Sequence, residues 1–334
     1  MNKKISELTA KGVIVTNPES VTLDDSVDTS RICKDVTIHA GCRISGKTTY
    51  IGASSVIGEE APVTIQDCQI GENVALKGGF FSGSTFLDGV EFCSGGHVRP
   101  GTLIEECVTC AHSVGLKQTL LMPYVTLGSL INFCDCFMSG GTGDKNHSEV
   151  GSSFVHFNFT PHQDKATPSL FGDVPRGVML DQPPIFLGGQ GGVVGPIRIE
   201  FGTVTAAGAV CRRDVTTGNK LVLGQATTST GERPYECWSY GDICRTVRNN
   251  FIYLGNLHAL FQWYKHVRSR YAGKNMTASV LHESAMIQIK TMVSERLKRL
   301  SGLADKLPAS LEIALKKHGE NELYKQPYMM QKNF

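Results

Sequence analysis

Ile51-Gly-Ala-Ser-Ser-Val-Ile57 and Ile70-Gly-Glu-Asn-Val-Ala-Leu76 carry an aliphatic residue at every sixth position, each time followed by a small or polar stretch. The same rhythm returns at Ile199-Glu-Phe-Gly-Thr-Val204 and continues through Thr205-Ala-Ala-Gly-Ala-Val210. A period of six is neither the period near 3.6 of an amphipathic helix nor the alternation of a strand. It is typical of a short-period solenoid, in which each hexad forms one side of a coil.

The hexads therefore predict an all-β, left-handed parallel β-helix, a hexapeptide-repeat solenoid. The aliphatic residue of each hexad points inward, the small residues turn the corner, and stacked coils share one core. We expect an N-terminal lead segment at 1–20, the solenoid at 21–226, and a separate α-helical C-terminal domain at 235–334. The helical domain is indicated by apolar residues that recur at helical spacing, such as Ile289, Val293 and Leu297.

The composition of the 334 residues excludes several classes of protein. Its 33 basic and 31 acidic residues are interspersed, unlike the broad basic surface of a nucleic-acid-binding protein. The N-terminus has no apolar signal-peptide core, and no run approaches the roughly 18 apolar residues that span a bilayer. We therefore expect a cytoplasmic protein with no nucleic-acid partner and no membrane insertion, whose 11 cysteines are reduced.

Two cysteine pairs, Cys107-Val-Thr-Cys110 and Cys134-Asp-Cys136, raise the question of a zinc site. Both pairs would have to converge on one tetrahedral ion, and a pair with a single intervening residue is a weak zinc signature. Small thiols also stack well between the coils of a β-helix. We interpret these cysteines as packing residues and predict no requirement for a metal.

The rhythm breaks between about 139 and 184, where polar, turn-rich segments surround an apolar stretch that starts at Val150. A long excursion from a regular solenoid is costly to order unless it serves function or assembly. Three histidines lie in or beside it, His147, His156 and His162. We expect the chemistry of the protein here.

Several motifs resemble a known family, in the same order along residues 85–225. They are Val98-Arg-Pro-Gly101, Lys117, Val150-Gly-Ser-Ser-Phe-Val-His-Phe-Asn158, and the stretch from Phe186-Leu-Gly-Gly-Gln-Gly-Gly192 to Val215. This pattern is similar to the acetyltransferase half of the bifunctional enzyme that makes UDP-N-acetylglucosamine. The resemblance implies a hexapeptide-repeat acyltransferase that assembles as a homotrimer with its sites between subunits.

The resemblance also implies roles for individual residues. Arg99 and Lys117 would hold the phosphate of a sugar phosphate, and Asn158 and Lys165 would complete the substrate site. On the side of the acyl donor, acetyl-coenzyme A or another acyl-coenzyme A, the implied residues are Ser152, Gly189, Ala207 and Arg213. The implied acceptor is an amino sugar phosphate or a nucleotide sugar.

The chain departs from the family pattern at the residues that matter most for catalysis. Counting forward from Lys117, the column of the family's catalytic histidine holds Ser129, and its tyrosine column holds Asn132. We expect His147 or His156 to have taken over as the catalytic base, since a histidine near neutrality can accept the proton of an attacking amine. Alternation along the strand would place His156 beside Asn158, facing a cleft between subunits.

Two other functions remain open from the sequence. The missing family histidine and the added helical domain favour a catalytically inactive module that binds a sugar nucleotide or acts as a scaffold. Alternatively, His147, His156 and His162 would surround a zinc ion, as in the β-helical carbonic anhydrases, and lower the pKa of a bound water.

Overall fold

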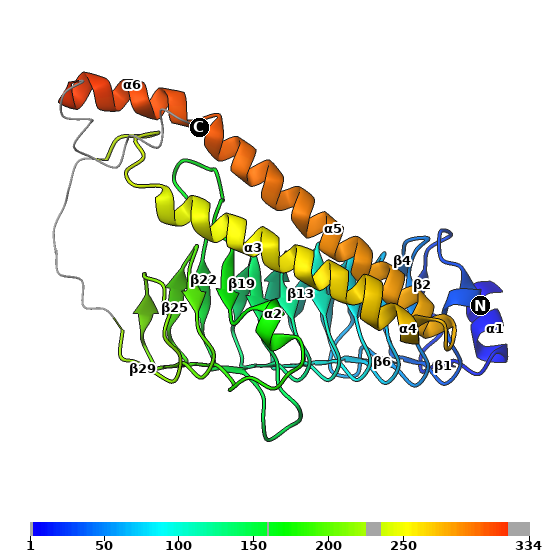
Figure 1. Cartoon of the computed structure of the whole chain (residues 1–334). Helices are drawn as coiled ribbons and strands as arrows, with labels where there is room; N and C mark the ends of the chain where they lie inside the picture. Colours follow the sequence, from blue (N-terminus) through cyan, green and yellow to red (C-terminus); the bar gives the residue numbers. More distant parts are fainter. Residues whose placement is uncertain (1–2, 159, 225–234, 320–334) are drawn as a thin grey trace.

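The computed structural model describes residues 3–158, 160–224 and 235–319. The chain winds into a solenoid whose strands form three parallel sheets (Figure 1). Each full coil adds one strand to each sheet, so hydrogen-bonded partners such as Phe92, Cys110 and Leu127 lie 17 or 18 residues apart. The parallel β-helix predicted from the hexads is confirmed.

Sheet A has eleven strands in the order β1 (Ile14–Val15), β3 (Thr37–Ile38), β6 (Val56–Ile57), β9 (Ala75–Leu76), β12 (Glu91–Phe92), β15 (Thr109–Cys110), β18 (Thr126–Leu127), β21 (Glu149–Val150), β24 (Phe186–Leu187), β27 (Val204–Thr205) and β29 (Leu221–Val222). Sheet B has ten, β2 (Thr22–Leu23), β4 (Arg43–Ser45), β7 (Val63–Gln66), β10 (Gly79–Ser82), β13 (Gly96–Val98), β16 (Gly115–Lys117), β19 (Asn132–Cys134), β22 (Val155–Phe157), β25 (Gly192–Val194) and β28 (Val210–Cys211). Sheet C has eight, β5 (Tyr50–Ile51), β8 (Gln69–Ile70), β11 (Ser84–Phe86), β14 (Thr102–Ile104), β17 (Leu120–Leu121), β20 (Cys136–Met138), β23 (Ser169–Phe171) and β26 (Arg198–Ile199).

The helical elements are α1 (Lys3–Ala10), the 3-10 turn η1 (Thr29–Arg31), α2 (Val174–Gly177), α3 (Cys244–Trp263), the π-helical turn η2 (Tyr264–Arg268), α4 (Ser269–Ala272), α5 (Met276–Ala304) and α6 (Leu307–His318). Helix α1 contributes Ile5 and Leu8 to the solenoid core, so it covers the first coil. No helix among the described residues is both long and apolar enough to cross a bilayer.

The predicted excursion at 139–184 is not one continuous departure from the solenoid. Within it the chain returns to sheet A at β21, to sheet B at β22 and to sheet C at β23. Three insertions, at 139–148, 158–168 and 172–185, the last of which contains α2, therefore separate strands that keep the parallel register. The polar segments read from the sequence are insertions at the corners of two coils.

The strands of sheet C have apolar residues on both faces. In the pairs Leu103-Ile104 and Leu120-Leu121, the second residue joins the solenoid core and the first joins a separate cluster with the helices. This second cluster contains Tyr253, Leu257, Leu260 and Tyr264 from α3 and η2, and Leu281, Ala285, Ile289 and Met292 from α5. Figure 1 shows α3 and α5 running in opposite directions along the solenoid. Among the described residues, the helical domain packs on sheet C, and no strand residue of sheets A or B belongs to the second cluster.

Polar groups are also buried between the helices and sheet C. The Tyr264 hydroxyl donates to Glu105 at 2.6 Å, and Arg268 lies 3.6 Å from the same carboxyl group. Burial raises the pKa of Glu105 to about 7. These contacts fix the helices along the solenoid in one position.

Candidate functional site

The corner between sheets A and B gathers several residues that the sequence assigns to the acyl donor. Strand register pairs Cys110 with Leu127, Leu127 with Val150, Val150 with Leu187, and Leu187 with Thr205. The residues two positions beyond these partners therefore lie in one column along the solenoid, which we call the corner column: His112, Ser129, Ser152, Gly189 and Ala207. The structure thus brings Ser152, Gly189 and Ala207 into line on successive coils.

Hydrogen bonds tie the corner column together. The Ser129 hydroxyl lies 2.8 Å from His112 Nδ1, and the Ser129 amide donates to the Ser152 hydroxyl at 3.1 Å. Each column residue is followed by one with positive φ, as at Leu130 (60°) and Ser153 (63°). This left-handed step turns the chain from sheet A into sheet B on each coil and points the column residues outward.

The opposite edge of sheet B, where it meets sheet C, carries the cations assigned to the substrate. Register places Lys117 beside Cys134, and Arg99 directly follows β13 at the equivalent position one coil earlier. Arg99 reaches across to Cys134, with its Nη2 3.7 Å from the Sγ. Neither Arg99 nor Lys117 forms a salt bridge with any described residue, so both charges remain free for an anion. Burial raises the pKa of Cys134, which stays a neutral thiol.

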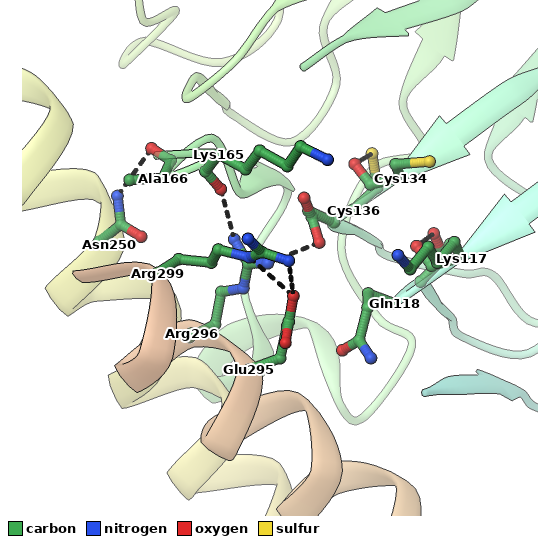
Figure 2. Close-up of polar contacts among 12 residues, drawn as sticks. Lys117, Gln118, Cys134, Cys136, Lys165, Ala166, Asn250, Glu295, Arg296 and Arg299 are labelled. Carbon is green, nitrogen blue, oxygen red and sulfur yellow. Dashed lines mark hydrogen bonds and ion pairs between the residues drawn. The ribbon is translucent and has the colours of Figure 1, made fainter. Parts of the chain in front are cut away.

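Lys165 joins this edge from the loop at 158–168, and helices α3 and α5 hold that loop in place. Figure 2 shows the Lys165 side chain extending toward the end of the strand that carries Cys134. Arg296 of α5 donates to the Lys165 carbonyl at 3.3 Å, and Asn250 of α3 donates to the Ala166 carbonyl at 3.0 Å. The helical domain therefore sets the position of one of the predicted substrate residues.

Arg296 has a second contact that anchors the same region. Its Nη2 donates to Asp135 at 2.7 Å, and both side chains are buried, at 2% and 9% exposure. Arg299, one turn further along α5, pairs instead with Glu295 at 2.6 Å (Figure 2). Both nearby carboxylates thus have arginine partners, which leaves the edge with an excess of positive charge from Arg99, Lys117 and Lys165.

Asn158 and Arg213 also follow strands of sheet B at this edge. Asn158 comes directly after β22 and is half-buried, and Arg213 is exposed two residues beyond β28. Ala207 lies six residues before Arg213, at the opposite corner of the sheet. The structure therefore does not bring Arg213 together with the other predicted donor residues of the same chain.

The predicted orientation of His156 toward a subunit cleft is wrong. Its side chain is only 2% exposed and points into the solenoid, where Nε2 lies 2.7 Å from the Ser169 hydroxyl. Alternation along β22 instead turns Phe157 outward. Burial lowers the pKa of His156 to about 3, because the apolar core disfavours the charged imidazolium. The catalytic role of His156 stays a prediction, and the burial of its side chain argues against it.

Because the pKa of His156 is depressed, we expect this residue to destabilise the fold in acid. In the unfolded chain the imidazole takes up a proton near pH 6.5, whereas in the folded chain it does so only near pH 3. Stability should therefore fall as the pH drops through this window, by up to about 1.4 kcal/mol per pH unit.

Urea unfolding at pH 6.5, 5.5 and 4.5 of the wild type and of His156→Gln measures this contribution. Glu105 acts in the opposite direction, since its raised pKa favours the folded state as the pH falls, but it is present in both proteins and cancels in their difference. The variant should lose less stability in acid than the wild type. Parallel curves for the two proteins would contradict the assignment.

His147 lies at a different corner from the donor residues. It precedes β21 by two positions, at the end of sheet A that adjoins sheet C, and its Nε2 is 3.7 Å from a Glu149 oxygen. Ser152 lies five residues later, beyond the strand, which corresponds to about 16 Å at the rise of an extended chain. The structure therefore does not bring His147 to the corner column within one chain, and its role as a base stays a prediction.

The described residues contain no group of three or more histidine, cysteine or acidic side chains that could hold a metal ion. His156 is inside the solenoid, and the His162 Nδ1 accepts the Trp238 amide at 2.9 Å. The three histidines considered for zinc therefore do not converge. Cys110 and Cys136 are buried in the solenoid core, in agreement with their interpretation as packing residues.

His112 was missed in the sequence because it lies outside the excursion and outside the motifs shared with the family. The signal that identifies it is the coil length. Counting 17 residues back from Ser129 gives the same position on the preceding coil, and that residue is His112. His112 thus lies beside Ser129, the position at which the resemblance predicts a histidine.

Comparison with known proteins supports the resemblance read from the sequence. The chain is 28% identical to the bifunctional protein GlmU of Thermotoga petrophila over 214 residues, which make up 64% of this chain and 42% of that protein. The corresponding figures are 28%, 65% and 42% for GlmU of Pelobacter propionicus, and 26%, 61% and 39% for GlmU of Streptococcus equi subsp. zooepidemicus. No protein-family model matches the chain. The chain spans about two fifths of the length of these curated relatives.

Proposed function

We propose, from this likeness to GlmU proteins and from the geometry of sheet B, that the protein is a hexapeptide-repeat acyltransferase. It moves an acetyl or other acyl group from a coenzyme A thioester to an amino sugar phosphate or a nucleotide-linked amino sugar. The observation that carries the proposal is the strand register, which aligns Ser129, Ser152, Gly189 and Ala207 at one corner while Arg99 and Lys117 lie side by side at the other edge of the same sheet.

The acceptor side of the proposal rests on charge. A phosphate group is best held by several cationic donors that are not already neutralised by carboxylates. Arg99, Lys117 and Lys165 meet this condition, because the nearby Asp135 is paired with Arg296. Asn158 lies at the same edge and supplies an amide that suits a sugar hydroxyl.

The donor side rests on the shape of the corner. Ser152, Gly189 and Ala207 are small, so an acyl thioester can approach the backbone closely along the column. Arg213 is exposed and suits the phosphates of the coenzyme. No metal takes part in the proposed reaction, which needs only a base for the attacking amine and donors for the oxyanion.

The two halves of this site lie apart within one chain. Five residues separate the corner column from the cationic edge on each coil, about 16 Å of extended chain. A site that uses both needs the corner of one subunit to face the cationic edge of another. We therefore include a homotrimer in the proposal, with sheets A and B available for assembly because the helices cover sheet C. The proposal also includes the cytoplasmic location expected from the sequence.

A thiol-release assay tests the function. The purified protein is mixed with acetyl-coenzyme A and a panel of amino sugar phosphates and nucleotide amino sugars, and free thiol is followed over time. We expect release that depends on one acceptor and saturates with it. Thiol release that no member of the panel accelerates would contradict the transferase assignment.

A second candidate function is a binding module without catalysis. Ser129 and Asn132, which stand where the related enzymes have their histidine and tyrosine, favour this alternative. A ligand that binds only the folded state raises the unfolding temperature. Stabilisation by a sugar nucleotide, together with no thiol release in the same samples, would favour the module over the enzyme.

A further inference from the structure

Ser129 and His112 form a side-chain pair with the geometry of a nucleophile and its base. The Ser129 Oγ lies 2.8 Å from His112 Nδ1, within the range at which a hydroxyl donates its proton to a neutral imidazole. The pair lies on adjacent coils at an open corner, with Ser129 half-buried and His112 exposed. A substrate can therefore reach the hydroxyl from solvent.

The surroundings of the pair hold the serine in place and put a carboxylate near the histidine. The Ser129 amide is held by the Ser152 hydroxyl, and the Ser153 amide donates to the Ser129 carbonyl at 2.7 Å. On the other side, the Ser94 amide donates to Glu60 at 2.9 Å. Hydrogen bonding from Ser94, followed by the charges of Lys77 and His112, lowers the pKa of Glu60. A carboxylate thus lies near His112.

The next coils of the column offer donors for an oxyanion. Among the described residues, the amides of Ser152 and Gly189 donate no hydrogen bond. A Cβ at position 189 would lie 2.8 Å from the Ser152 carbonyl oxygen, so glycine at this position lets the two coils pack closely. Backbone amides beside a nucleophile are the groups that stabilise the tetrahedral intermediate of acyl transfer.

We propose that Ser129 accepts the acyl group covalently and that His112 is its general base. The inference rests on the proposed acyl transfer, and it adds an acyl-serine intermediate to it. The Ser129 oxygen attacks the thioester carbonyl carbon while its proton moves to His112 Nδ1. The carbon–sulfur bond then breaks, and the coenzyme thiolate leaves with that proton.

The second half of the reaction reverses the roles. The neutral amine of the acceptor attacks the acyl carbon, and its proton passes to His112. The bond from the acyl carbon to Ser129 Oγ breaks, and the serine oxygen recovers the proton from the imidazolium. Base catalysis of this type contributes roughly 10²- to 10⁴-fold to a rate.

The experiment traps the intermediate. Full-length protein is mixed with acetyl-coenzyme A without acceptor, quenched in acid and digested, and the peptide containing Ser129 is examined by mass spectrometry. A parallel sample receives p-nitrophenyl acetate, which reports acylation as a burst of nitrophenolate without any natural acceptor. Ser129→Ala and His112→Ala are compared with two controls, Ser94→Ala from the same corner and His39→Ala from a corner nearer the N-terminus, with unfolding temperatures measured for all.

We expect an acetyl group on Ser129 of the wild type, no acetyl group in Ser129→Ala, and acylation slowed about 100-fold or more in His112→Ala. Both controls should acylate like the wild type.

Acceptor-dependent thiol release by the wild type and by a folded Ser129→Ala protein would overturn the inference while leaving the acyltransferase proposal intact. Acylation of Ser129 without acceptor-dependent release would support the pair and overturn the proposed transfer. Absence of acylation from both donors would overturn the pair.

Discussion

Replacing Arg296 with methionine is expected to lower the free energy of unfolding by about 3–5 kcal/mol. Arg296 and Asp135 are both buried where α5 meets the corner between sheets B and C, and their side chains meet at 2.7 Å. Burial already raises the pKa of Asp135, and Arg296 is the largest influence that opposes this rise. Without the arginine, the carboxyl group remains buried with no cationic partner, which is the costly arrangement for a broken buried pair.

Urea unfolding of Arg296→Met, Arg299→Met and the double variant Arg296→Met/Asp135→Leu measures this cost. Arg299→Met is the matched control, because its pair with Glu295 is partly open to solvent and should contribute about 1 kcal/mol or less. The double variant removes both charges and should recover much of the lost stability. Equal losses for Arg296→Met and Arg299→Met would show that the buried pair does not anchor the helices.

Replacing Arg99 and Lys117 together by methionine is expected to raise the KM for a phosphate-bearing acceptor by at least 10-fold. Hydrogen bonds to charged groups contribute about 1.5–3 kcal/mol each, and each 1.4 kcal/mol corresponds to tenfold in affinity. Because both side chains lie on the face of sheet B and form no salt bridge with the described residues, the fold should tolerate the change.

Steady-state thiol release at varied acceptor concentration measures the effect. Arg43→Met is the control, since Arg43 is an exposed arginine of the same sheet on a coil nearer the N-terminus. It should leave the KM for the acceptor unchanged. A double variant with the wild-type KM, or an equal rise in the Arg43→Met protein, would place the phosphate elsewhere.

Binding of the phosphate-bearing acceptor should also depend on helices α3 and α5, because they hold the loop that carries Lys165. The Lys165 carbonyl accepts from Arg296, and the Ala166 carbonyl accepts from Asn250. A loop of this length would otherwise sample many positions, and its lysine would contribute less to binding. The helical domain, absent from the resemblance that the sequence suggested, thus supports one half of the proposed site.

The solenoid was predictable because its pattern is local and repeated. Each hexad such as Ile51–Ile57 specifies its own side of a coil, and many repeats agree, so single irregularities do not obscure the period. The helical character of the C-terminal region was predictable for the same reason. The doublets Leu103-Ile104 and Leu120-Leu121 also carried a signal that we did not use, since adjacent apolar residues on a strand indicate that both of its faces are covered.

The sequence by itself determined the coil, its corners and the presence of helices, since these follow from contacts within one repeat or one helical turn. Only the tertiary structure decided that His156 points into the core and that His112 meets Ser129 across 17 residues. It also decided that Arg296 meets Asp135 across 161 residues. The reason is that corners take up insertions of different lengths while the strands keep their register. The number of residues between two contacting side chains therefore varies from coil to coil, and a fixed spacing in the sequence does not identify the partner of a polar group.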